Sequence, residues 1–230
     1  MITLNCLILE ITRRCNMSCD HCLRGDAQAM DIDPKVIDKV LDQVESVGSV
    51  VFTGGEPTLN IPAIRYFTRA IKKRKLSLGY FYVVTNGKKE SLPFVKALID
   101  LYNICDNYDE EDFFGGLAVS KDQYHEAINP LKIYKALKFY HPKENSGPID
   151  SEQLLGEGRA AENYLTDKAP ETLYKFNLEG DEDLYIEDLY VAANGNIVSN
   201  CNMSFNRIDK ESFGNVLTES LENIIKNNKV

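Results

Sequence analysis

Three cysteines lie within eight residues near the start of the chain, in the stretch Cys15-Asn16-Met17-Ser18-Cys19-Asp20-His21-Cys22. Thiolates at spacings of four and three residues can reach one metal centre from a single loop. A structural zinc ion takes four protein ligands, so His21 or a remote residue would have to supply the fourth. An iron–sulfur cluster takes one thiolate per iron, so three thiolates on a four-iron cluster leave one iron open. The spacing alone therefore admits a cluster, a zinc ion or unligated structural cysteines.

Composition and charge favour a metal site over disulfides. The 230 residues are 43% hydrophobic and 27% charged, as in an average globular domain, and the net charge of −9 disfavours nucleic acid as a partner. The longest apolar runs, such as 50–52 and 80–84, are far shorter than the roughly 20 residues of a membrane-spanning helix. The first four residues lack the basic flank of a signal peptide. We therefore expect a cytoplasmic protein without a membrane partner, in which cysteines stay reduced and clustered thiols bind metal.

Apolar patterning predicts alternating strands and helices that would position this loop. Residues 4–12 read as a strand, and Asp33 caps a helix whose apolar stripe runs from Val36 to Val47 and ends at Gly48. A short buried strand over 50–53 follows and is closed by Gly54-Gly55. The same patterns continue as helices over 64–71 and 92–102, and as strands over 79–85 and 117–120.

The second half of the chain is less regular. We expect a helix around 130–140, at most one strand near 152–155, a hairpin of 186–192 and 196–201 about Asn194-Gly195, and a terminal helix over 217–226. Alternating strands and helices imply a parallel sheet built of right-handed crossovers. About six strands, rather than eight, predict an open partial α/β barrel with its ligands at the carboxyl ends of the strands.

Three loops at these strand ends together resemble the radical S-adenosylmethionine (SAM) superfamily. They are the cysteine loop after the first strand, Gly54-Gly55-Glu56-Pro57 after the second and Thr85-Asn86-Gly87 after the third. The resemblance covers roughly residues 4–160 and implies an α/β fold, a partial (β/α)6 barrel with a C-terminal β-hairpin and helix.

The same resemblance implies the cofactors and the chemistry. Cys15, Cys19 and Cys22 would bind a [4Fe-4S] cluster whose open iron chelates the amine and carboxylate of SAM. One electron, from a reductant of the flavodoxin or ferredoxin type, would then cleave SAM to methionine and a 5′-deoxyadenosyl radical that abstracts a substrate hydrogen.

The residues suit a SAM site when they are taken one by one. Gly54 and Gly55 permit close backbone approach, and Glu56 can accept a charge-assisted bond from the methionine ammonium. By resemblance these three residues form the SAM amine site, and the backbone at His21 lies beside the adenine. Thr85, Asn86 and Gly87 either complete the SAM site or form an ordinary turn.

Three further side chains have both a functional and a structural interpretation. Ser120 resembles the ribose-contacting serine of the family, or it caps a helix starting near Asp122. Arg159 lies in a Gly-Arg-Ala stretch like that of peptide-modifying members, where the arginine comes near the SAM carboxylate, or it is an exposed loop residue. His125 is a substrate contact or a surface helix histidine.

The C-terminal segment resembles the start of a SPASM or twitch extension, over residues 191–201 and 213–216. These extensions hold several cysteines around auxiliary clusters, whereas this segment has Cys201 only, so we expect one cluster per chain and a hairpin that caps the barrel. Cys201 is a buried small residue, a thiol hydrogen-atom donor or an auxiliary ligand, while Cys6 and Cys105 are packing residues. We expect a radical SAM core over 1–160, and the end of that core with a short extension over 161–230.

Several functions are compatible with these features. The first is a radical SAM enzyme that acts on a peptide or protein residue by epimerisation, crosslinking or related C–H chemistry. The alternatives are a glycyl-radical enzyme activase and a small-molecule enzyme of the nucleotide type. The non-enzyme alternative is a zinc-binding interaction module.

Overall fold

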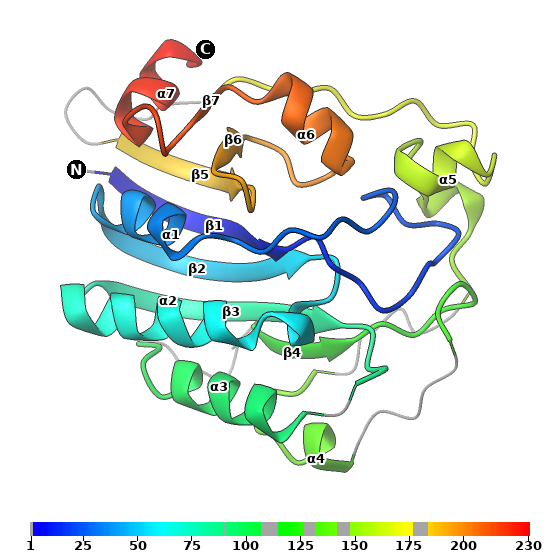
Figure 1. Cartoon of the computed structure of the whole chain (residues 1–230), viewed down its shortest axis with the longest axis horizontal. Helices are drawn as coiled ribbons and strands as arrows, with labels where there is room; N and C mark the ends of the chain where they lie inside the picture. Colours follow the sequence, from blue (N-terminus) through cyan, green and yellow to red (C-terminus); the bar gives the residue numbers. More distant parts are fainter. Residues whose placement is uncertain (1, 90, 107–114, 127–131, 142–147, 177–183) are drawn as a thin grey trace.

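The computed structural model describes residues 2–89, 91–106, 115–126, 132–141, 148–176 and 184–230, which form one seven-stranded sheet in the order β4-β3-β2-β1-β5-β6-β7. The strands are β1 (Ile2–Thr12), β2 (Val44–Gly54), β3 (Ser77–Thr85), β4 (Gly116–Val119), β5 (Leu184–Val191), β6 (Asn196–Val198) and β7 (Gly214–Asn215). Neighbours among β1 to β5 pair in parallel, whereas β6 and β7 are antiparallel additions. In the described sheet β4 and β7 are the two ends, which confirms the predicted open partial barrel (Figure 1).

Helices between successive strands cover the outer face of the sheet. They are α1 (Pro34–Leu41), α2 (Ile61–Arg74) and α3 (Leu92–Tyr102), and their apolar sides form the main core with β1 to β4 (Figure 1). Proline at the start of each helix suits the first turn, and Asp33 and Ser91 cap α1 and α3 as acceptors. The remaining elements are α4 (Lys132–Lys135), α5 (Gly158–Glu162), α6 (Phe205–Glu211), α7 (Leu221–Asn227) and the 3-10 turns η1 (Pro57–Leu59) and η2 (Ser151–Gln153).

A buried charge network joins β1 to α6 and β5. The Arg13 side chain is fully buried, with Nε 2.6 Å from Glu10 Oε1 and its two Nη atoms 2.7 and 2.8 Å from the carboxylate of Asp209. Glu10 also accepts from the Tyr190 hydroxyl at 2.6 Å. Buried charges are tolerated when they are paired and hydrogen-bonded, so this network fixes the C-terminal segment on the barrel.

The structure corrects two of the predicted elements. The helix expected from Asp33 to Gly48 ends at Leu41, and β2 begins at Val44, because Val44 and Val47 pair with Ile2 and Leu4 of β1. The strand expected near 152–155 is the turn η2, which Asp150 caps.

The predicted hairpin and the helix around 130–140 are confirmed in part, and two short helices were not predicted. The hairpin about Asn194-Gly195 is present, with Gly195 at a φ of +88°, but Cys201 lies beyond the end of β6. Of the helix expected around 130–140, α4 is the helical part that is described, and residues 130 and 131 lie outside the described ranges. The short helices α5 and α6 were not predicted, since they bury few apolar residues.

Candidate functional site

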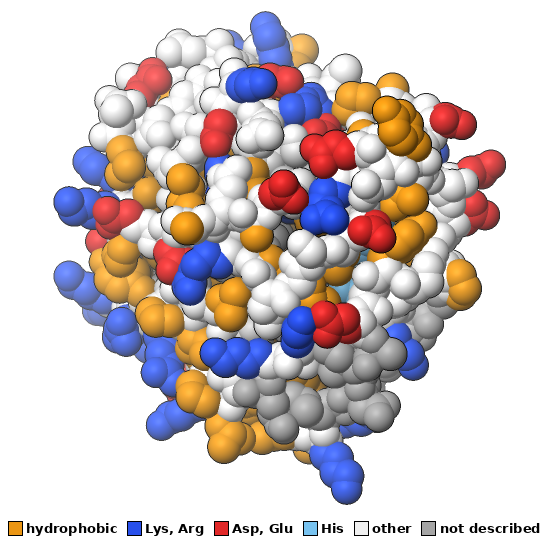
Figure 2. Space-filling view, turned by 45° about the vertical axis from the view of Figure 1, so that its right-hand side comes forward, with side chains coloured by type: hydrophobic (Ala, Val, Ile, Leu, Met, Phe, Trp, Pro, Cys, Tyr) orange, Lys and Arg blue, Asp and Glu red, His pale blue; other side chains and the backbone are white. Residues whose placement is uncertain are grey.

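A cavity of about 310 Å³ opens at the carboxyl ends of the parallel strands. Its walls come from the loops after β1, β2, β3 and β4, and the sequence-predicted residues among them are Cys15, Cys19, His21, Cys22, Gly54, Gly55, Glu56, Asn86, Ser120 and His125. Figure 2, turned so that this end of the molecule comes forward, shows acidic and basic side chains interspersed over the surface. The fold thus gathers at one place the residues that the sequence spreads over more than a hundred positions.

The three clustered cysteines are all free thiols that face this cavity and a smaller one of about 50 Å³ beside it. Burial raises the pKa of Cys15 and raises that of Cys19 to about 11, and the neighbouring thiols add to both shifts. Metal ligation requires thiolates, so binding at this loop would release protons.

The separation of the three sulfurs bears on a shared zinc site. Among the side chains the structure describes, His21, Asp122 and His125 are the possible ligands that come within 4.8 Å of one another, and the cysteines form no such group. Three sulfurs around one zinc ion would lie about 4 Å apart, given Zn–S bonds of about 2.3 Å. A four-iron cluster spaces its thiolates more widely, because each binds a different iron. As they lie in this structure, the three sulfurs are too far apart to bind one zinc ion together.

Glu56 ties the loops of the site together from a buried position. Its carboxylate accepts four hydrogen bonds: Oε1 from the Thr58 amide at 3.0 Å, the Thr58 hydroxyl at 2.7 Å and the Thr85 hydroxyl at 2.6 Å, and Oε2 from the Asn86 amide at 2.8 Å. The residue is 1% exposed. A methionine ammonium, the partner expected from the sequence, would share these oxygens with donors of the protein. The carboxylate therefore holds the β2 and β3 loops in register.

The two glycines before Glu56 are required by the backbone after β1. A Cβ on Gly54 would lie 1.9 Å from the Thr12 carbonyl oxygen, and one on Gly55 would lie 2.2 Å from the Arg14 carbonyl oxygen. The Gly55 amide donates to Thr12 and the Glu56 amide to Arg14, both at 2.8 Å. The close backbone approach expected at these glycines is present toward Thr12 and Arg14, and both glycines also line the cavity.

The third and fourth strands contribute polar groups that complete the cavity. Asn86 Nδ2 donates to Asn16 Oδ1 at 2.8 Å and lies 3.9 Å from the Cys15 sulfur, so the β3 loop contacts the cysteine loop directly. Thr85 is buried behind the cavity, bonded to Glu56. Ser120 is half-buried at the end of β4 and caps no helix, because the residues after it, through 126, form turns.

Arg159 holds the cysteine loop from the opposite side. Its guanidinium lies 3.1 Å from Ser18 Oγ, 3.3 Å from Asp26 Oδ1 and 3.4 Å from Asp20 Oδ1, and its amide donates to the Cys22 carbonyl at 2.9 Å. Arg159 lines the smaller cavity together with the three cysteines. Arg159 thus contacts the cysteine loop through its side chain and its amide, and it is not the exposed loop arginine of the alternative interpretation.

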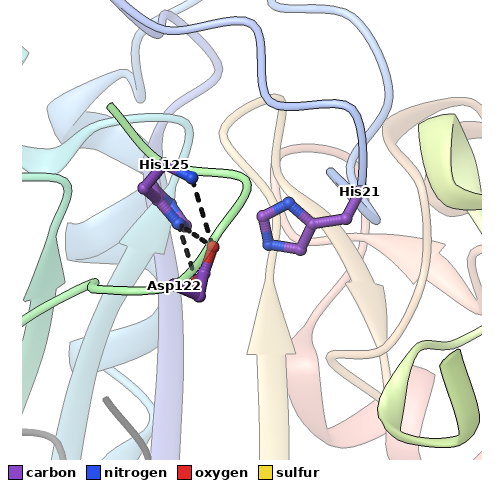
Figure 3. A group of neighbouring side chains, drawn as sticks. All are labelled: His21, Asp122 and His125. Carbon is purple, nitrogen blue, oxygen red and sulfur yellow. Dashed lines mark hydrogen bonds and ion pairs between the residues drawn. The ribbon is translucent and has the colours of Figure 1, made fainter. Parts of the chain in front are cut away.

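His125 is a cavity residue in a turn, not a surface helix histidine. Its Nδ1 lies 2.9 and 2.8 Å from the two carboxylate oxygens of Asp122, whose side chain is 4% exposed (Figure 3). Burial would raise the pKa of Asp122, but His125 and the Tyr124 amide lower it overall. Sequence reasoning did not single out Asp122, although an Asp-x-x-His spacing after a strand end was a usable signal.

Cys201 lies on the other side of the sheet from the outer helices. It packs against the cluster of Ile8, Tyr190, Ala192, Val198, Met203 and Ile208, together with Cys6. It lines neither of the two cavities that contain the cysteine loop.

A largely parallel open sheet, whose carboxyl-end loops gather three thiols over one cavity, defines a partial α/β-barrel protein. The chain belongs to the radical SAM superfamily, whose family model matches residues 9–130, more than half of the sequence. Members of this superfamily use a [4Fe-4S] cluster and SAM.

Sequence relatives share part of this chain. It is 35% identical over 101 residues to the tungsten-containing aldehyde ferredoxin oxidoreductase cofactor-modifying protein of Pyrococcus furiosus, which is 41% of this chain and 27% of that protein. It is 30% identical over 119 residues to the GTP 3′,8-cyclase of Chlorobaculum tepidum, which is 48% of this chain and 36% of that protein. The matched stretches thus span about a third or less of these relatives.

A solved structure shares the fold over nearly the whole chain. Native anSMEcpe, solved with bound AdoMet and the Cp18Cys peptide, superposes with a TM-score of 0.52 at 11% identity and covers 98% of this chain and 80% of that one. Among the helices that the structure describes, none has the length and apolarity to cross a bilayer.

Proposed function

We propose that Cys15, Cys19 and Cys22 hold the [4Fe-4S] cluster and that SAM occupies the adjoining 310 Å³ cavity. The bound pair supplies one-electron cleavage of SAM to methionine and a 5′-deoxyadenosyl radical, with the electron coming from a flavodoxin- or ferredoxin-type reductant. The observation that carries the proposal is the convergence of the three thiols with Gly54, Gly55 and Glu56 on one cavity.

In this assignment the chain's own residues bind and orient. Glu56 fixes the β2 and β3 loops, so that the polar groups of Asn86 and the backbone of Gly54 and Gly55 present a rigid wall to the methionine end. Ser120 and the backbone at His21 face the nucleoside end. Arg159 holds the cysteine loop and is close enough to favour the Cys19 thiolate.

Single substitutions test the cluster assignment. Cys15→Ala, Cys19→Ala and Cys22→Ala should each lose the bound iron and sulfide and the formation of 5′-deoxyadenosine under anaerobic, reducing conditions. Each should keep its cooperative unfolding, because the loop lies at the barrel mouth. The matched control is Cys105→Ala, a buried thiol beyond α3, which should keep both the cluster and the cleavage. Retained cleavage in all three loop variants would refute the assignment.

The substrate in our proposal is a peptide or protein residue, modified by epimerisation, crosslinking or related C–H chemistry. Support comes from the Gly-Arg-Ala stretch at Arg159 and from a C-terminal hairpin that continues the sheet past the family match. The shared fold extends over 98% of the chain with a structure that holds a peptide.

A nucleotide-type small molecule is the second candidate, because one relative is a GTP 3′,8-cyclase. Uniformly deuterated candidate substrates separate the two, since the radical carries the abstracted deuterium into 5′-deoxyadenosine. Deuterium from a peptide supports the first assignment, and deuterium from a nucleotide supports the second.

Cys201 is the proposed hydrogen-atom donor should the reaction be an epimerisation. Arg24, which lines the main cavity, lies close enough to lower the pKa of this thiol, although burial raises it overall. Cys201→Ala should then still cleave SAM and abstract hydrogen, but should lose the epimer labelled from D2O. Unchanged product and rate would assign Cys201 to packing.

A further inference from the structure

Two imidazoles and one carboxylate converge at the rim of the main cavity. His21 comes from the cysteine loop, whereas Asp122 and His125 come from the turn after β4, and their possible ligand atoms all lie within 4.8 Å of one another. Figure 3 shows the His21 ring facing the Asp122–His125 pair across the gap between the two loops. His21 and His125 both line the cavity.

The surroundings hold these side chains in place. The His21 ring stacks on the Tyr124 ring, with centroids 4.6 Å apart, and meets the His125 ring edge-on at 5.2 Å. Asp122 accepts from the amides of Tyr124 at 2.9 Å and His125 at 3.2 Å, and its two oxygens flank His125 Nδ1. In the neutral histidine, Nδ1–H donates to the carboxylate while Nε2 keeps a lone pair.

We propose that His21, Asp122 and His125 form a second metal site, which takes a divalent first-row transition ion independently of the cluster. Two histidines and one carboxylate are a ligand set for Fe(II), Mn(II) or Zn(II). Two ligand atoms that each bond one ion at about 2.1 Å are at most about 4.2 Å apart. The ligand atoms here lie within 4.8 Å of one another, so the two loops would need to approach each other by less than about 1 Å.

Charge and position suggest what the ion would do. Asp122 is a buried carboxylate near Cys19, and the nearby Lys88 is paired with Glu126, so the rim favours a cation. Three protein ligands leave coordination positions open, and two of those ligands line the cavity. The ion would therefore hold an oxygen-bearing group of the substrate, such as a carboxylate, phosphate or peptide carbonyl. This site does not depend on the identity of the substrate.

Mn(II) is the probe, because it favours oxygen ligands over thiols and gives an electron paramagnetic resonance signal when free. We expect titration of the cluster-loaded protein to remove one equivalent of free Mn(II) per chain. Asp122→Asn and His125→Gln should each weaken binding by about tenfold or more. Glu45→Gln is the control, an exposed carboxylate at the amino-terminal end of β2 that is remote from the cavity, and should bind as the parent does.

A measurement on the unaltered protein covers the case in which a variant misfolds. Electron spin-echo modulation of the bound Mn(II) should show nitrogen coupling from two imidazoles. The absence of Mn(II) binding, equal affinity in all variants, or bound Mn(II) without nitrogen coupling would each overturn the metal site. Because the titration does not use SAM cleavage, such a result would leave the proposed cluster and SAM assignment standing.

Discussion

At the scale of single residues, Glu56 connects the loops after β2 and β3, which we expect to bind SAM. Its carboxylate is buried and accepts from Thr58, Thr85 and Asn86, so its removal leaves several buried donors without an acceptor. Hydrogen bonds to charged groups contribute about 1.5–3 kcal/mol each, and an unsatisfied buried donor costs a similar amount. A positioning residue of this kind affects binding through the shape of the loop.

We expect Glu56→Ala to weaken SAM binding by about tenfold or more, with iron content unchanged. Calorimetric titration of the cluster-loaded protein measures the affinity. Hydrogen exchange at the amides of Thr58 and Asn86 should also become faster, which a direct contact to the ammonium alone would not cause. Glu45→Ala, an exposed carboxylate at the other end of β2, is the control. Parental affinity in Glu56→Ala would show that the motif is an ordinary turn.

At the scale of elements, α5 holds the cysteine loop through a close backbone contact. Gly158 has a φ of +54°, and a Cβ there would lie 2.4 Å from the Leu23 carbonyl and 2.6 Å from the Cys22 carbonyl. The Arg159 amide bonds to Cys22 from the same turn. The helix can seat the loop only while position 158 carries no side chain.

Gly158→Ala should therefore displace the loop and speed the loss of iron to a chelator, which the decay of visible absorbance follows. Gly25→Ala is a matched control in the same loop, since Gly25 also has a positive φ, +80°, but nothing lies within 4 Å of its Cβ position. Both variants carry a left-handed strain of about 1–2 kcal/mol, and only Gly158→Ala adds the clash. Equal rates of iron loss in the two would mean that the contact is unimportant.

The attachment of α6 to β1 should depend on pH. Burial opposes the ionisation of Asp209, but the bonds from Arg13 outweigh it and lower the pKa of this carboxyl below its usual value. The Asp209–Arg13 bonds therefore stabilise the folded state fully at pH values above the pKa of an ordinary aspartate. This stabilisation is lost as the pH falls through the lowered pKa of Asp209. Asp209→Asn should reduce the melting temperature at neutral pH and flatten its decline in acid. A parallel decline in variant and parent would exclude Asp209 as the source.

The elements also show what the sequence could predict. Strand ends marked by Gly-Gly and Asn-Gly were placed correctly, because turn chemistry is local, and so were the loops that gather at the cavity. The boundary between α1 and β2 was not, because valines at 44 and 47 fit a helical stripe as well as a strand until β1 lies beside them. The Asp122–His125 pair and the clamp of Arg159 depend on contacts between distant loops, which spacing along the chain does not contain.

At the scale of the whole molecule, the folded domain extends beyond the residues that match the family model. The match ends at residue 130, yet β5 pairs with β1 along seven registered positions from Ile2 to Leu9. Its buried residues Ile186 and Leu189 belong to the main core. The last third of the chain therefore completes the barrel on which the site is built.

A chain that ends at residue 160 should not fold cooperatively, because β1 loses one neighbour and Arg13 loses Asp209. Circular dichroism on heating should show no sharp transition, and the truncated chain should aggregate through the open edge of β1. A chain that ends at Asn227 is the control, since it keeps every strand and helix and loses the Phe176–Lys229 bridge and the hydrogen bonds of Asn228 and Val230. Cooperative unfolding of the 160-residue chain would show that residues 1–160 fold without the rest of the chain.

The position of β1 has a consequence for synthesis on the ribosome. Glu10 and Tyr190, which bond directly across the β1–β5 contact, are 180 positions apart. β1 therefore waits, with one edge unpaired, until β5 has been translated. Such distant pairing slows folding and exposes intermediates to aggregation. Nascent chains of this protein should depend on chaperones that shield a strand edge, and translational pauses between β4 and β5 should lower the yield of native protein more than pauses after β5.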